Sequence, residues 1–124
     1  MSINVVNLVG RAGTDPKTRI FDTSGKVLCT FPIAVDRRSR NRDQPDWFNL
    51  KIWGKTAEIA TDYVKKGKLI GIQGSLVIET WKDQNGNNRS KPVILVDRLE
   101  LLGSRREDEA YANSGRYPSG EGEF

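Results

Sequence analysis

The stretch WFNLKIW, residues 47–53, alternates strictly between polar or aromatic and apolar side chains. This alternation is the period of a β-strand with one buried and one exposed face. The apolar residues occupy the even positions, so Trp47 and Trp53 share the other face with Lys51. A half-buried strand normally turns its large aromatic side chains toward the core. Two tryptophans beside a lysine on the polar face therefore indicate a binding role.

Further strands are indicated on both sides of this stretch. Residues 3–12 are rich in valine and leucine without a helical period, and residues 27–35 carry an apolar face that includes Cys29. The pair Asn85-Gly86 is a strong hairpin signal between two long alternating runs. Strands are predicted at 3–12, 27–35, 47–53, 69–82 and 89–102, with a short additional pairing segment at 18–21.

Residues 55–66 are the one segment with a helical period. Their apolar stripe consists of Ile59, Ala60, Tyr63 and Val64. Five strands with a helix between the third and the fourth is the layout of the oligonucleotide/oligosaccharide-binding (OB) barrel. The predicted fold class is therefore all-β with one short helix, a five-stranded OB-fold barrel.

Composition excludes most kinds of catalytic and metal site. The chain has 124 residues, no histidine and one cysteine, so it offers no histidine base, no Cys/His zinc site and no internal disulfide. We predict no enzyme activity, no metal and no cofactor, and we interpret Cys29 as a packing residue. No apolar run is long enough for a membrane helix, and the first residues lack a signal-peptide pattern, so a cytoplasmic location without membrane contact is expected.

Charge divides the chain near Gly103. Residues 1–102 hold 17 Lys and Arg against 11 Asp and Glu, whereas residues 103–124 hold 3 against 5. A basic body favours a polyanionic partner, because neutralising phosphates and releasing their counterions supplies affinity. The last segment has almost no aliphatic side chains, so we predict a binding domain at 1–102 and a disordered acidic tail at 103–124.

Trp81 is the third tryptophan on a polar face, in line with Glu79. Aromatic faces stack bases, and interleaved lysines neutralise phosphates, which together suit single strands because a duplex hides its base faces. Each stacked base contributes on the order of 1 to 3 kcal/mol. Two alternatives stay open: an RNA-binding OB protein, and an interaction subunit whose tryptophans face another protein.

Several stretches, in order along residues 1–102, resemble the bacterial single-stranded DNA-binding protein family. The resemblance implies binding of single-stranded DNA without strong sequence preference, in DNA replication, recombination and repair, at the nucleoid. It also implies a homotetramer in which the first strand pairs across one dimer contact. The matching stretches are 4–11, Asp15-Pro16 with Arg19, 31–35, 47–58, 63–67 and 81–86.

By this resemblance the three tryptophans stack bases, and Lys55 and Lys66 match basic positions along the DNA path. Some family members carry another stacking aromatic in the loop after the second strand. This chain has arginines there, which substitute through cation–π contact. The candidate nucleic-acid-binding residues are Trp47, Trp53, Trp81, Lys51, Lys55, Lys66, Arg37 and Arg38.

The C-terminal tip departs from the family pattern. Family tails end in an acidic run followed by Ile-Pro-Phe or similar, which docks on replication and repair proteins. This chain ends Gly-Glu-Gly-Glu-Phe, so it keeps Glu121, Glu123 and Phe124 but lacks the proline and the dense acidic run. The tip is a candidate docking site for such proteins; the alternative is a solvated acidic end that competes weakly with DNA for the basic face.

Overall fold

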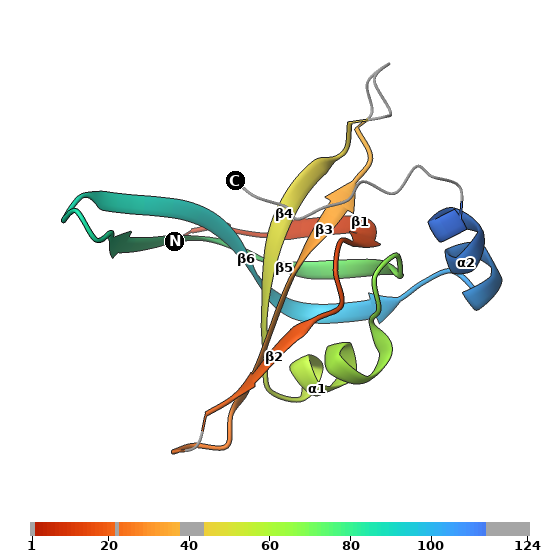
Figure 1. Ribbon diagram of the computed structural model, residues 1–124, viewed down its shortest axis with the longest axis horizontal. Helices are drawn as coiled ribbons and strands as arrows, with labels where there is room; N and C mark the ends of the chain where they lie inside the picture. The colour runs from red at the N-terminus through yellow and green to blue at the C-terminus, as the bar shows by residue number, and fades with distance from the viewer. Residues whose placement is uncertain (1, 22, 38–43, 114–124) are drawn as a thin grey trace.

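The computed structural model describes residues 2–21, 23–37 and 44–113, and the structural statements below concern these residues. They form one six-stranded sheet in the order β1-β5-β6-β4-β3-β2, with two helices outside it (Figure 1). The elements are β1 (Val6–Ala12), β2 (Lys17–Ile20), β3 (Val27–Val35), β4 (Asp46–Trp53), α1 (Gly54–Tyr63), β5 (Leu69–Lys82), β6 (Asn88–Leu101) and α2 (Arg105–Asn113).

The sheet closes into a ring of five strands because β1 pairs with both β5 and β3. Arg11 and Ala12 are opposite Ala34 and Ile33 at the closure. A Cβ on Gly10 would lie 2.5 Å from the carbonyl oxygen of Ala34, so only glycine allows this approach. The prediction of five main strands with a helix between the third and the fourth is confirmed. The short strand β2 is added outside the ring, on the edge of β3.

The hydrophobic core fills the inside of the ring. Leu50 and Ile52 of β4 point inward, as their alternation predicts, and pack with buried residues of the facing strands such as Ile33. Cys29 is fully buried in this cluster, and burial raises the pKa of its thiol, against the smaller lowering effect of two threonine hydroxyls. Cys29 is therefore a neutral packing residue at pH 7.

Strands β5 and β6 continue beyond the ring as a two-stranded arm, seen at the left of Figure 1. The pairing shifts by one residue between Gln73 and Gly74, where the arm begins. Leu76 and Ile78 continue the apolar alternation of the buried Ile70 and Ile72, but both are exposed. The face continues along the strand, but the ring that would cover it ends first.

Helix α1 covers one end of the ring through its small residues. Ala57 and Ala60 are buried, and Val64 is buried just after the helix. The predicted stripe is partly wrong, because Ile59 and Tyr63 are exposed. Contact through alanines brings the helix close to the ring and leaves the larger side chains on its outer side.

A second short helix follows the ring, within the first part of the segment predicted as a tail. The chain turns at Gly103, whose φ of 69° is left-handed, and α2 follows at 105–113. Ser104 and Glu107 form a capping box: the Ser104 hydroxyl accepts from the Glu107 amide at 3.1 Å, and the Glu107 carboxylate accepts from the Ser104 amide at 3.2 Å. These local hydrogen bonds stabilise the start of the helix although the segment has few aliphatic side chains for a core. Residues 114–124 lie outside the described residues.

Candidate nucleic-acid interface

The register of β3 and β4 places the polar and aromatic residues of 47–53 on one face, as predicted; this face is half-buried at Trp47 and Lys51 and exposed at Trp53. Residues opposite each other in an antiparallel pair project to the same side of the sheet. On this side Lys51 is opposite Thr30, and β2 adds Lys17, also opposite Thr30. The outer side of β2, β3 and β4 is thus one continuous surface. Its further pairs are Ala34 with Trp47, Pro32 with Asn49, Leu28 with Trp53, and Arg19 with Leu28.

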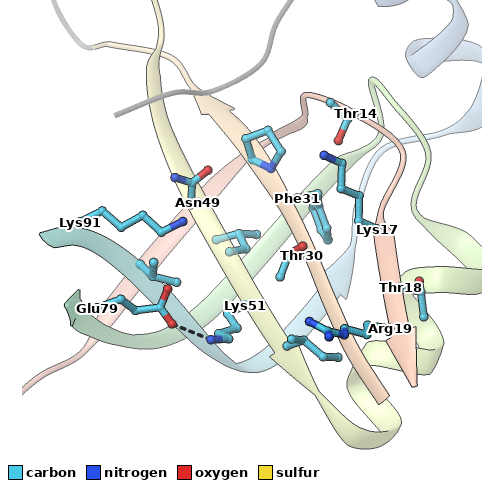
Figure 2. Close-up of a pocket in the computed structure, with 14 residues that line it drawn as sticks. Thr14, Lys17, Thr18, Arg19, Thr30, Phe31, Asn49, Lys51, Glu79 and Lys91 are labelled. Carbon is cyan, nitrogen blue, oxygen red and sulfur yellow. Dashed lines mark hydrogen bonds and ion pairs between the residues drawn. The ribbon is translucent and has the colours of Figure 1, made fainter. Parts of the chain in front are cut away.

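A groove of about 770 Å³ runs across this surface and reaches β6 and the arm. Its floor is partly apolar, with Phe31 and Val93 among the lining residues. Figure 2 shows basic side chains on both sides of β4: Lys17 and Arg19 toward β2, and Lys91 toward the arm. A cationic groove with an apolar floor suits a strand that carries phosphates outside and bases inside.

Trp53 is opposite Leu28, which lines the groove, and its ring is part of a short stack. Its ring lies on that of Phe21, with centroids 5.5 Å apart and an interplanar angle of 28°. The Arg19 guanidinium lies 5.3 Å from the Phe21 centroid. Trp53 is still 38 % exposed, so part of its ring is open to a ligand. The stack holds the ring in a fixed orientation, which lowers the entropic cost of binding a base.

Trp81 lies on the arm and is 46 % exposed. The Lys91 ammonium lies 5.9 Å from its ring centroid. The tip beyond it is organised by Asp83, whose carboxylate accepts from the amides of Asn85 and Asn87, each at 2.9 Å. These bonds, with Asn87 the largest effect, lower the pKa of Asp83, so they persist until the pH falls through that lowered pKa. The arm therefore offers Trp81 from an ordered hairpin.

Trp47 is the least accessible of the three tryptophans. It is half-buried, and a Cβ on Gly13 would lie 2.5 Å from its Cζ3 atom. The same Cβ would lie 3.1 Å from Cγ of Pro32, so Gly13 makes room for the ring. One part of Trp47 is thus taken by packing, and it is less open to a base than Trp53 and Trp81.

Glu79 is an acidic group within the cationic groove. Its Oε2 lies 2.5 Å from the Lys51 ammonium, and Figure 2 shows this contact reaching from β5 toward β4. Glu79 is also directly opposite Lys91 in the β5–β6 pairing. The carboxylate neutralises part of the charge that a phosphate would otherwise meet at Lys51.

The remaining predicted residues are less closely grouped. Arg37 is exposed and pairs with Asp46 at 2.8 Å, next to Trp47 in sequence. Lys55 is exposed in the first turn of α1, two residues after Trp53. Lys66 does not line the groove; it lines a hollow between α1 and α2. Arg38, Glu121, Glu123 and Phe124 lie outside the described residues.

Sequence reasoning missed three basic groove residues that a strand pattern could have indicated. Lys17 and Arg19 lie two residues apart on β2, the spacing of one strand face. Lys91 faces Glu79 once the hairpin turn is centred on Asn85. Phe21, the support for Trp53, was predicted only as part of the pairing segment 18–21, and it lies just beyond the end of β2.

Within the described residues, no cluster of three or more cysteine, aspartate or glutamate side chains is placed to hold a metal ion. Neither α1 nor α2 is long and apolar enough to cross a membrane.

Comparison with known proteins gives consistent matches along most of the chain. Residues 3–102 match the model of the single-strand binding protein family. The chain is 59 % identical to single-stranded DNA-binding protein 1 of Synechocystis sp. over 120 residues, which covers 95 % of this chain and 98 % of the relative. It is 53 % identical to the single-stranded DNA-binding protein of Thermosynechococcus vestitus over 118 residues, 94 % of this chain and 97 % of the relative.

Proposed function

Since the chain belongs to the single-strand binding protein family and binds single-stranded DNA, we propose that it stacks bases on its tryptophans and neutralises phosphates with the groove cations. The observation that carries this mechanism is the shared surface of Trp53, Trp81 and the cationic groove. Both rings are exposed and each adjoins a residue that lines the groove: Trp53 is opposite Leu28, and Trp81 lies beside Lys91. Stacking tolerates any base, so low sequence preference follows.

A titration of intrinsic tryptophan fluorescence tests the proposal. The ligands are oligo(dT), oligo(U) and duplex DNA, each at two salt concentrations. We expect strong quenching by oligo(dT), little by duplex DNA, and affinity that falls with a logarithmic salt slope of about 0.7 per neutralised phosphate. Binding of oligo(dT) without quenching would separate the tryptophans from the DNA site. Tighter binding of oligo(U) than of oligo(dT) would favour RNA as the ligand.

Glu79→Gln is expected to tighten binding. The amide keeps the shape of the side chain but releases Lys51 from its carboxylate, so a phosphate meets a full positive charge. We expect the Kd for oligo(dT) to fall by about threefold or more and the salt slope to steepen by about 0.7. Glu100→Gln is the matched control, because Glu100 pairs with Arg98 and does not line the groove. Equal affinities of the two variants would contradict a competing role of Glu79.

The proposed biological role is to coat exposed single strands during DNA replication, recombination and repair, in association with the nucleoid. Binding through base faces and phosphates, which all sequences share, supports such a general role. We also propose that Glu121, Glu123 and Phe124 dock on replication and repair proteins. The terminal carboxylates and aromatic ring support this assignment.

We propose a homotetramer, because the chain exposes two separate apolar surfaces. Val9 is 55 % exposed on the outer face of β1, whereas Ile78 is 57 % exposed on the other face of the arm, beside Leu76. A closed tetramer with dihedral symmetry needs two different two-fold contacts, whereas a dimer needs one. Two apolar surfaces on different faces fit the larger assembly.

Lysine substitutions in each surface test the tetramer. Light scattering after size exclusion is expected to give the wild-type chain four times the mass of the 13.9 kDa monomer. Val9→Lys and Ile78→Lys are each expected to halve that mass, because a buried unpaired charge breaks one contact and spares the other. A wild-type monomer, or a single variant that abolishes all association, would contradict the two-surface arrangement.

A further inference from the structure

Helix α2 is attached to the ring chiefly through charge. The two oxygens of Asp108 accept from different cations: Oδ1 from Arg11 Nη1 at 2.8 Å, and Oδ2 from Lys68 Nζ at 3.0 Å. The Arg11 guanidinium also lies 4.2 Å from the ring centroid of Tyr111. No described side chain of α2 belongs to the hydrophobic core. Such an attachment responds to competing anions far more than packed apolar contacts do.

The two cations are fixed to the ring independently of α2. Arg11 Nη1 also donates to the carbonyl oxygen of Gly67 at 2.8 Å, and Lys68 Nζ donates to that of Leu102 at 2.9 Å. Both carbonyls belong to residues outside the helix. With α2 in place, the two side chains are 16 % and 19 % exposed. The cation pair would therefore keep its geometry if Asp108 moved away.

A phosphodiester resembles the carboxylate that Asp108 places between Arg11 and Lys68. Like a carboxylate, it carries one negative charge over two free oxygens, and arginine and lysine are its usual partners. We propose that Arg11 and Lys68 form a second phosphate-binding site, which Asp108 occupies in the free chain and from which single-stranded DNA displaces α2. The inference rests on the proposed function, because it extends the path of the same DNA strand.

The site adjoins the groove already described. Thr14 lines the groove, and the carboxylate of its neighbour Asp15 accepts from the backbone amide of Lys66 at 2.8 Å. Beyond this contact lies a hollow of about 660 Å³ between α1 and α2, bordered by Asp108. A strand leaving the groove beside Thr14 meets the hollow next. Besides Asp108, the hollow is lined by the basic and aromatic residues Lys65, Lys66, Lys68 and Tyr63 and by the acidic residues Asp62 and Glu109.

Hydrogen exchange on the full chain tests whether DNA displaces the helix. The amides of residues 105–113 are followed in the free protein, with a short oligo(dT) of about 8 nucleotides and with one of about 35, given that one OB fold covers roughly 4 to 16 nucleotides. We expect about tenfold faster exchange in α2 with the long oligonucleotide only, because helix release exposes these amides. Unchanged or slower exchange with the long oligonucleotide would overturn the proposal. Absence of binding by both would instead contradict the proposed function.

Asp108→Asn gives an independent test through affinity. This variant weakens the competitor while keeping its size, so the long oligo(dT) should bind about fivefold more tightly and the short one equally well. Asp62→Asn is the control, since Asp62 lines the same hollow but lies on α1. Equal gains in both variants, or weaker binding by Asp108→Asn, would overturn the proposal. If Asp108→Asn does not fold, as thermal unfolding will report, the exchange experiment on the unmodified chain decides.

Discussion

Trp81→Ala is expected to weaken the binding of oligo(dT) by about 5- to 150-fold, the equivalent of the roughly 1 to 3 kcal/mol that one stacked base contributes. The ring is 46 % exposed on the groove side of the arm and does not belong to the hydrophobic core. The substitution also removes the contact between the Lys91 ammonium and the ring. At an exposed site such a contact contributes little to the stability of the fold. The melting temperature should therefore change little while the affinity falls.

Trp81→Phe separates stacking from other effects of the substitution. A phenyl ring still stacks, so this variant should recover most of the lost affinity. If Trp81 instead faces a neighbouring protein, Trp81→Ala would change the mass of the assembly and leave the affinity for oligo(dT) unchanged. Fluorescence titration and light scattering on the same samples distinguish these two outcomes.

Local alternation and turn chemistry were enough to predict the main strands. The hairpin at Asn85-Gly86 and the alternating stretch 47–53 depend on neighbouring residues only, and both lie where the sequence predicts them. The errors arise where long-range geometry decides. Ile78 continues an apolar face past the end of the ring, and α2 is stabilised by Asp108, whose partner Arg11 is 97 residues away in the chain.

The candidate site likewise has features that the local sequence predicts and features that depend on contacts between distant segments. The faces of Trp53 and Trp81 follow from strand period, so they could be predicted. The support of Trp53 by Phe21 and the neutralisation of Lys51 by Glu79 could not, because each joins segments that are distant in sequence. Accessibility too depends on such contacts, as the packing of Trp47 against Gly13 shows.

Gly74→Ala is expected to destabilise the fold strongly. A Cβ at Gly74 would lie 2.1 Å from the carbonyl oxygen and 2.9 Å from the carbonyl carbon of Leu95. Both are backbone atoms of the neighbouring strand β6, which cannot move aside as a flexible side chain does. Strand β1 also pairs with β5 at Gly74, through Val6, so a shift of β5 would disturb pairing on both sides. We expect a loss of about 3 kcal/mol or more, and a melting temperature lower by about 10 °C or more.

Gly71→Ala is the matched control in the same strand. Its Cβ would be tight only against the end of the Leu102 side chain, at 3.3 Å, and that group can rotate away; Val9 and Glu100 would lie at ordinary contact distances of 3.8 and 3.9 Å. The two variants are compared by thermal unfolding at one protein concentration, because association contributes to the measured stability. Equal melting temperatures would contradict the requirement for glycine at the bulge. The expected difference has a functional consequence: Gly74 lies where β5 leaves the ring, so a displaced bulge would also reorient the arm and move Trp81 away from the groove.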